Sequence, residues 1–504
     1  WGKGVLETDH LVKEELGDPN IRVGAIGLAG ENQVSMANIV FETNRAGASR
    51  MGGQIMASKN LKAIAMRGSG AIDLADKTLV RELSRDLIKR INENQMCISR
   101  ATGGGSHTQG LTCQIGSAPI KNLTTSVFDD IAGVAPEMIM GHYTKANAGC
   151  PGCPIHHHFS WEIKDGPYAG EKGVGLEGGV IMLWAGLVGN SYAPAVFAAN
   201  KLCNDYGIDE LETAMAISAA MEWLEKGIIS KKDLDGLDLK FGDHAAMMEM
   251  IHRIARRQGF GDLLAEGPVA AAEKLGKSAQ ECINYGKGRI SAWLDWRVLK
   301  GGYLSEVTSS PACEMMDGWP GGWEILKTMG KVTPELSALG TARFGSPEAF
   351  DQLSYNKARA VAYCQDFAIV IDSLDLCKFI TDWMFACCTM KDAADLFQAV
   401  TGIDMGEEGF IKAAGRIRDL ERAYWVREGY TRKDDRLEGK IMNEPVPDGP
   451  FKGASLDKAE IEKMLDEFYQ LRGWDVKTGI PTREKLLEDG LEDIVADLEK
   501  RGKL

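Results

Sequence analysis

The sequence predicts an α+β multidomain protein, in which a β-rich first segment is followed by a mainly helical remainder. A chain of 504 residues is longer than one hydrophobic core can serve, and an apolar content of 44% is typical of globular proteins. Up to about residue 71, short apolar runs such as 23–26 and 63–66 lie between glycine-rich turns, as β-strands do. From about residue 72 onward, apolar residues recur three and four positions apart, which indicates helices.

A short helix opens the chain and is expected to end near Gly17, because glycine readily adopts a left-handed C-cap. The chain starts abruptly at Trp1, so we expect that the natural protein carries a segment before it. The apolar period predicts further helices at residues 79–92, 194–205, 211–226, 245–258, 268–275 and 355–367.

Two stretches rich in small and polar residues depart from this pattern. Gly103 to Pro119 and Glu306 to Pro347 are rich in Gly, Ser, Thr and Pro, and we expect both to be functional loops. The longest apolar run, residues 178–189, is interrupted by glycines and is shorter than the ~20 residues that span a bilayer. It predicts a buried helix and no membrane span.

The overall charge and the cysteine content exclude other classes of protein. A formal charge of -14 argues against a nucleic-acid binder, because phosphate backbones are bound by clustered Lys and Arg. Eleven cysteines in so long a chain do not resemble a small secreted disulfide scaffold. We expect reduced thiols, metal ligation and a cytoplasmic location.

A cysteine pair followed by three histidines is the sharpest local motif. It reads Cys150-Pro-Gly-Cys153-Pro-Ile-His156-His157-His158 and brings thiolate and imidazole ligands onto one turn. The ligand types fit an iron-sulfur cluster, a structural zinc site or a metal-free redox pair. The motif alone leaves all three open.

Two short segments after predicted helices resemble each other, Asn204-Asp-Tyr-Gly-Ile-Asp209 and Asp372-Ser-Leu-Asp-Leu-Cys377. In the first, Gly207 can end a helix in the left-handed conformation and Asp209 can cap the next one. Such a corner presents backbone N–H groups beside a carboxylate. Two ordinary helix connections are the alternative.

Several motifs together identify a known family. They comprise Ile26-Gly-Leu-Ala-Gly-Glu-Asn32, Ala48-Ser-Arg-Met-Gly-Gly53 and Ser58-Lys-Asn-Leu-Lys-Ala-Ile64, followed by the cysteine motif, the two corners and residues 265–276. In order and spacing the chain resembles the aldehyde ferredoxin oxidoreductase family. The resemblance implies part of a β-rich cofactor-base domain (1–71), a helical domain with the cluster motif and first corner (72–284), and a helical domain with the second corner (285–504).

The resemblance also implies cofactors: a tungsten or molybdenum ion held by two pyranopterins, Mg bridging the pterin phosphates, and a 4Fe-4S cluster. The family motifs place pterin contacts at Arg50, Gly52 and Gly53, at Asn204, Asp205, Ile208 and Asp209, and at Asp372, Leu376 and Cys377. Two positions depart from the family pattern, Asn204 where Asp is usual and Asp375 where Gly is usual.

For the cluster, the family spacing selects Cys150, Cys153, position 157 and Cys377. Position 157 is histidine here rather than cysteine. A neutral imidazole carries one negative charge less than a thiolate, so it favours the reduced cluster and raises the reduction potential. We expect His157 to serve as a ligand, with loss of the cluster as the alternative.

Two glutamates are the catalytic candidates. Glu177 matches a family glutamate near the metal, and Glu314 stands where aldehyde-oxidising relatives show an imidazole. Either carboxyl could move a proton if burial raises its pKa.

The function implied by the resemblance is oxidation of an aldehyde to a carboxylic acid, with electrons passing through the cluster to ferredoxin or a partner subunit. A homo-oligomer is compatible with the family. One alternative is a reductive enzyme, because the helical part and the closing segment 471–482 also resemble the catalytic subunit of class II benzoyl-CoA reductases. Another is a zinc-bound or metal-free scaffold subunit, in view of Asn204, His157 and Glu314.

Overall fold

The first segment of the chain folds into a four-stranded antiparallel sheet of order β3-β2-β1-β4. Val23 and Ala25 of β1 are buried against Val5 and Val40, which gives this sheet a small core of its own. The computed structural model describes residues 1–47, 51–310, 312–382 and 386–504, with side chains for all of these except 107–109. The elements of this segment are α1 (Val5–Glu15), β1 (Arg22–Ala25), α2 (Leu28–Glu31), β2 (Ile39–Phe41), β3 (Arg45–Gly47), α3 (Gly52–Ser58) and β4 (Ala63–Met66).

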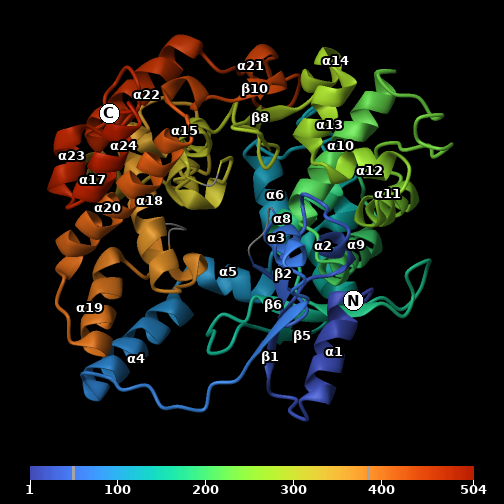
Figure 1. Ribbon diagram of the computed structural model, residues 1–504, viewed down its shortest axis with the longest axis horizontal. Helices are drawn as coiled ribbons and strands as arrows, with labels where there is room; N and C mark the ends of the chain where they lie inside the picture. The colour runs from blue at the N-terminus through green and yellow to red at the C-terminus, as the bar shows by residue number, and fades with distance from the viewer. Residues whose placement is uncertain (48–50, 311, 383–385) are drawn as a thin grey trace.

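The middle of the chain forms a helical lobe beside this sheet (Figure 1). A second antiparallel sheet, of order β5-β6-β7, lies at its edge, and β6 begins at His158, the last histidine of the cysteine motif. The elements of this sheet are β5 (Thr144–Ala148), β6 (His158–Glu162) and β7 (Lys172–Val174). The helices are α5 (Gln95–Gly103), α6 (Ser106–Gln114), η1 (Ile131–Val134), α7 (Pro136–Met138), η2 (Ile139–Tyr143), α8 (Gly178–Ile181), η3 (Met182–Leu187), α9 (Ala193–Tyr206), α10 (Glu210–Glu225), α11 (His244–Arg256), α12 (Phe260–Ala265), α13 (Pro268–Leu275) and α14 (Lys277–Gln280).

The last part of the chain forms a second helical lobe, shown in yellow to red in Figure 1. Helix α4 (Lys77–Glu93) lies with this lobe although it belongs to the early sequence, because Arg90 donates to the carbonyl of Cys387 at 2.7 Å and pairs with Asp392. The helices of the lobe are α15 (Lys300–Thr308), η4 (Met315–Asp317), α16 (Gly321–Glu324), α17 (Pro334–Phe344), η5 (Pro347–Phe350), α18 (Ala358–Ser373), η6 (Lys378–Ile380), α19 (Met390–Thr401), α20 (Gly406–Arg427), η8 (Arg432–Asp434), α21 (Lys440–Asn443), α22 (Lys458–Arg472), α23 (Arg483–Glu488) and α24 (Glu492–Lys500).

The two lobes share one continuous core. Strand β10 (Glu438–Gly439) from the late sequence pairs with β8 (Asn284–Gly286), which also pairs with β9 (Arg289–Ile290). Just beyond β10, the buried Lys440 Nζ lies 2.6 Å from Glu222 Oε2 of α10. The predicted domain boundary at 284/285 falls inside β8, and the division into three domains stays a prediction.

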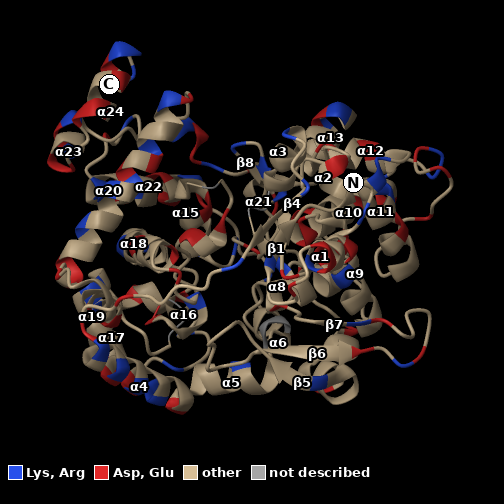
Figure 2. Ribbon diagram, turned by 60° about the horizontal axis from the view of Figure 1, so that its bottom comes forward, with Lys and Arg blue, Asp and Glu red and all other residues tan. Residues whose placement is uncertain are grey.

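The α+β prediction is confirmed, and the predicted buried helix at 178–189 is α8 followed by the π-helix η3. The loop predictions were wrong in part, since α6 occupies most of 103–119 and short helices occupy much of 306–347. Gly105, Gly318 and Gly340 in these stretches pack closely against other residues, whereas Gly110 and Gly330 have open space beside them. Figure 2 shows charges of both signs interspersed over the outer helices. No helix within the described ranges is both long and apolar enough to cross a membrane.

Candidate functional site

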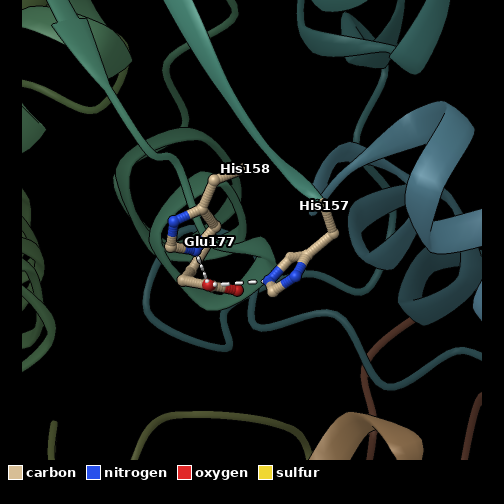
Figure 3. A group of neighbouring side chains, drawn as sticks. All are labelled: His157, His158 and Glu177. Carbon is tan, nitrogen blue, oxygen red and sulfur yellow. Dashed lines mark hydrogen bonds and ion pairs between the residues drawn. The ribbon is translucent and has the colours of Figure 1, made fainter. Parts of the chain in front are cut away.

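A single carboxylate, Glu177, lies between two buried imidazoles (Figure 3). Its Oε1 is 3.0 Å from Nε2 of His157, and the same oxygen is hydrogen-bonded to Nε2 of His158. His157 and His158 lie where the cysteine motif enters β6, and Glu177 is the N-cap of α8. The structure therefore joins the end of the cysteine motif to one of the two predicted catalytic acids.

The hydrogen bonds of His158 assign its tautomer. Arg45 is a donor only, and its Nη1 lies 3.0 Å from His158 Nδ1, so Nδ1 accepts and Nε2 carries the proton that Glu177 receives. The ligand atoms of His157, His158 and Glu177 lie within 4.8 Å of one another. A metal bound by all three would need the lone pair of His158 Nε2 and would leave an N–H facing Arg45. The geometry favours a hydrogen-bonded carboxylate over a zinc site.

The charge on Glu177 is fixed by these imidazoles. Burial raises the pKa of its carboxyl, but the hydrogen bonds from His157 and His158 outweigh burial and hold the pKa well below its usual range. The condition stated for proton transfer, a pKa raised by burial, is therefore not met at Glu177. Glu177 is an ionised acceptor at neutral pH.

Two glycines, Gly104 and Gly105, pack directly against the backbone of His157 and Glu177. A Cβ on Gly105 would lie 2.7 Å from the carbonyl carbon of Glu177 and would overlap the N–H of Gly178. A Cβ on Gly104 would lie 3.0 Å from the carbonyl oxygen of His157. The run Gly103-Gly-Gly was read as a loop signal, whereas these two glycines let α5 and α6 approach the site.

The Glu177 carboxyl is enclosed by protein without being fully covered. Protein surrounds the carboxyl closely enough for desolvation to oppose its ionisation, yet 40% of its side-chain surface is accessible. On the same helical segment, the side chain of Trp184 lies beside the Glu210 carboxyl and lowers its pKa by hydrogen bonding. A polar region with accessible carboxylate surface fits a bound polar group.

The three cysteines expected as cluster ligands are electrostatic neighbours. Burial raises the pKa of the Cys377 thiol, the backbone N–H of Phe379 lowers it, and the thiols of Cys153 and Cys150 raise it further. Cys153 Sγ also accepts from the N–H of His156 at 3.5 Å. Backbone N–H groups directed at sulfur are typical of iron-sulfur ligands.

His157 lies between these cysteines and Glu177. Its ring packs edge-on against Phe379, two residues after Cys377, with ring centroids 5.3 Å apart at 78°. Its Nε2 is engaged by Glu177, and the second nitrogen, Nδ1, is on the part of the ring turned away from Glu177 (Figure 3).

The two predicted corners share a backbone conformation. In the first, Gly207 has φ 62° and the N–H of Ile208 bonds to Cys203 O at 3.0 Å. In the second, Asp375 has φ 55° and the N–H of Leu376 bonds to Ile371 O at 2.9 Å. Asp375 thus adopts the left-handed conformation of the glycine that the family usually has there.

The polar side chains of the corners differ in their surroundings. Asp209 is buried and caps α10, with both hydrogen bonds, from the N–H groups of Leu211 and Glu212, ending at Oδ1. Asn204 donates to Asn200 O at 2.8 Å, and Asp205 caps α1 through the N–H of Leu6. In the second corner, Asp372 pairs with Lys378 at 3.0 Å and remains largely exposed. Ile208 is buried and Leu376 is partly buried among apolar side chains.

The second predicted acid, Glu314, lies with the first corner. Glu314 and Asp209 line one cavity of about 50 Å³, together with Trp293. The buried Nε1 of Trp293 has no hydrogen-bond partner in the described part of the chain. Glu314 itself caps η4 by accepting from the N–H of Met316 at 3.0 Å.

The predicted phosphate contacts lie at the start of α3. Arg50 falls outside the described residues. Met51 has φ 80° and precedes Gly52, the first residue of the helix. A Cβ on Gly53 would overlap Asn38 O, so close packing against Asn38 already requires glycine at this position.

Sequence reasoning missed several polar residues around Glu177. Arg45 orients His158, and Arg100 stacks on Phe379 with its guanidinium carbon 3.9 Å from the ring centroid. Burial raises the pKa of Glu210 to about 8, and Asn200 Nδ2 lies 3.0 Å and 3.1 Å from its two oxygens. Glu210 adjoins Asp209, which was a usable signal, whereas nothing local points to the two arginines.

Comparisons with known proteins agree on one family. The model of aldehyde ferredoxin oxidoreductase domains 2 and 3 matches residues 82–491, and the model of the N-terminal domain matches residues 1–68. The tungsten-containing aldehyde ferredoxin oxidoreductase of Pyrococcus horikoshii is 32% identical over 507 residues, covering 98% of this chain and 77% of the relative.

More distant proteins are also similar. The aliphatic sulfonate oxidoreductase WOR-like subunit of Pyrococcus furiosus is 24% identical over 94% of this chain and 71% of its own length. A solved structure of the benzoyl coenzyme A reductase active-site complex BamBC, in complex with 1,5 dienoyl-CoA, superposes with a TM-score of 0.80 at 23% identity. That match covers 100% of this chain and 78% of the solved chain, and it shows a common fold.

Proposed function

Since this chain belongs to the aldehyde ferredoxin oxidoreductase family, we propose that it oxidises an aldehyde to a carboxylic acid and passes the electrons to ferredoxin or a partner subunit. The family makes it an oxidoreductase with a tungsten-pterin cofactor. We propose that a 4Fe-4S cluster carries the electrons outward, that Mg bridges the pterin phosphates and that molybdenum can replace tungsten. All eleven cysteines are free thiols, which is compatible with a cytoplasmic location.

The contact between His157 and Glu177 carries this proposal. It joins the cysteine group, where electrons would leave, to an ionised carboxylate whose side chain is partly accessible. An enzyme that removes electrons and protons from the same substrate needs such groups near each other. A scaffold subunit has no need of a carboxylate held in this way.

The residues present fit the proposed cofactors. The indole N–H of Trp293 is a buried donor that a polar ligand would satisfy. Carboxylates such as Asp209 and Asp372 can accept paired hydrogen bonds from the amino-pyrimidinone edge of a pterin. We propose that Asn204, Asp205, Ile208, Leu376 and Cys377 complete the two corners, and that Arg50, Gly52 and Gly53 contact the phosphates.

For the cluster, we propose Cys150, Cys153, Cys377 and His157 as ligands. A histidine that binds metal usually donates its other N–H to a carboxylate, which fixes the tautomer. Glu177 accepts from Nε2 of His157, so the Nδ1 lone pair is the one available for iron. The hydrogen bond to Glu177 and iron ligation are therefore compatible on one imidazole.

Within the reaction, the protein groups position water and substrate. The bound tungsten-pterin group supplies the two-electron chemistry. Glu177 is ionised, and we propose that it accepts a hydrogen bond from water or substrate and so orients that group. Glu314 lies at the cavity beside the first corner, where we propose that it faces the substrate and orients it by hydrogen bonding.

Metal analysis combined with an aldehyde assay tests the proposal. Protein purified anaerobically is expected to contain tungsten or molybdenum together with about four iron atoms, the content of one such cluster. It is then expected to reduce an artificial one-electron acceptor when an aldehyde is added. Zinc as the only bound metal, or reduction of aryl-CoA thioesters without aldehyde oxidation, would contradict the proposal.

A further inference from the structure

Arg100 is an interior cation between Glu177 and the cysteine group. It belongs to α5, which is fixed at its start by the side chain of Asn94, an acceptor for the N–H groups of Met96 and Cys97. The guanidinium carbon lies 3.9 Å from the ring centroid of Phe379. The same ring packs edge-on against His157, so Phe379 is in contact with both Arg100 and His157.

The charge of Arg100 is not matched by a hydrogen-bonded acid. Across the described ranges, its guanidinium takes part in no hydrogen bond and no ion pair with a carboxylate. Desolvation lowers the pKa of the guanidinium, while electrostatic interaction raises it, first with the carboxylate of Glu177 and then with the sulfurs of Cys377 and Cys97. Burying an unpaired guanidinium is costly, so such a group is expected beside an anion.

Glu177 is the first of the charges that act on Arg100, but within the described ranges no hydrogen bond or ion pair joins the two side chains. The Oε1 oxygen of Glu177 is already engaged by the hydrogen bonds from His157 and His158, which lower its pKa. The other neighbours are the thiols Cys377 and Cys97. Cys377 is the one that lies beside Cys153 and Cys150, the set proposed to hold iron.

We propose that Arg100 is the internal counter-charge of the iron-sulfur cluster and raises its reduction potential, an inference that rests on the proposed function above. A cluster bound by thiolates is anionic, and reduction adds one more negative charge. A fixed cation in a poorly polarisable interior attracts that added charge strongly. The reduced state is stabilised, and the cluster accepts an electron more readily.

The placement on Phe379 makes this effect specific to Arg100. A guanidinium stacks on an aromatic face and keeps its position, which a flexible ammonium does less well. Phe379 follows Cys377 by two residues, so the ring ties the cation to the segment that carries the proposed ligand. Arg100 is thus a positioning residue that acts through charge.

The test is an EPR-monitored redox titration of the metal-loaded protein, with iron measured on every sample. Arg100→Gln is expected to keep its iron and to shift the midpoint potential of the cluster to a more negative value. Arg100→Lys keeps the charge and is expected to shift less. Arg85→Gln removes the same charge from an exposed position on α4 and is expected to leave the potential unchanged.

The outcomes separate this inference from the proposed function. Wild-type protein without iron would overturn the cluster itself. A cluster of unchanged potential in Arg100→Gln, or equal shifts in Arg100→Gln and Arg100→Lys, would overturn the role of the charge. If Arg100→Gln loses iron, a second variant replaces it. Phe379→Leu removes the aromatic ring on which the guanidinium stacks, and an unchanged cluster potential in Phe379→Leu would contradict the inference. An altered KM for carboxylated aldehydes at unchanged potential would instead assign Arg100 to the substrate.

Discussion

His157 Nε2 lies 3.0 Å from Glu177 Oε1, and this contact connects the cysteine motif to the internal carboxylate. Because His158 bonds to the same oxygen, Glu177 is held from two sides in one orientation. The position that carries a cysteine in the family thus carries a side chain able to contact the carboxylate and iron through different nitrogens. The predictions below test this arrangement and the packing behind it.

Glu177→Gln tests the carboxylate itself. The amide can still accept a hydrogen bond from one imidazole, so the fold and the metal content are expected to stay unchanged. The amide carries no negative charge with which to orient water or substrate, and we expect kcat for aldehyde oxidation to fall by roughly 10²–10³-fold. Steady-state kinetics on samples of equal tungsten and iron content measure this, and undiminished activity would rule out the role.

His157→Cys tests the histidine as a cluster ligand. A thiolate adds negative charge at the cluster, so the midpoint potential is expected to fall while the iron content is retained. The hydrogen bond to Glu177 is lost, and the rate of aldehyde oxidation is expected to fall as well. His156→Ala changes the exposed neighbour and serves as the control. A potential equal to that of the wild type would mean that His157 is not a ligand.

Gly105→Ala tests how the backbone positions Glu177. Gly105 has φ −72°, so alanine fits the backbone, but its Cβ would collide with the segment from Glu177 to Gly178. We expect a loss of about 1–3 kcal/mol of unfolding free energy, together with reduced activity. Gly110→Ala on the same helix meets no atom within 4 Å and is expected to preserve both. Denaturant unfolding measures the unfolding free energy of the two variants, and steady-state kinetics measures their activity. Equal stability and equal activity of the two variants would contradict the packing argument.

Asp419→Asn tests a pH-dependent contribution to stability far from the site. Burial raises the pKa of Asp419 to about 7, with a further increase from its hydrogen bond to Asp489. The folded pKa lies above the unfolded value of 3.8, so the contribution is present below about pH 4 and is lost as the pH rises through 7.

The asparagine resembles the protonated acid and keeps the acceptor for Trp474 Nε1. Relative to wild type, Asp419→Asn is therefore expected to gain on the order of 2 kcal/mol between pH 5 and pH 8. Denaturant unfolding of both proteins at the two pH values measures the difference. A difference that does not change with pH would show that Asp419 is ionised in the folded state.

Local patterns account for what the sequence predicts correctly. The left-handed Gly207 and the capping Asp209 follow from residue types at fixed spacing, and both are found in the structure. The cysteine motif and Glu177 lie twenty-odd positions apart, so their proximity could be predicted only from the family resemblance.

Long-range contacts account for what could not be predicted. Arg45 comes from the first sheet and Arg100 from α5, and neither belongs to a motif. Asp375 takes the left-handed conformation in spite of its side chain, which residue type alone disfavours. Gly104 and Gly105 were read as loop residues because glycine is permissive, whereas here contact with Phe159 and Gly178 requires them.

The most direct test of the central claim is the response of the cluster to substrate. Oxidised protein that contains tungsten and iron is mixed anaerobically with an aldehyde, and the EPR signal of the reduced cluster is followed. The account predicts that this signal appears with wild-type protein and fails to appear within the same time with Glu177→Gln. A cluster that dithionite reduces but no aldehyde does, in protein of full metal content, would contradict the account.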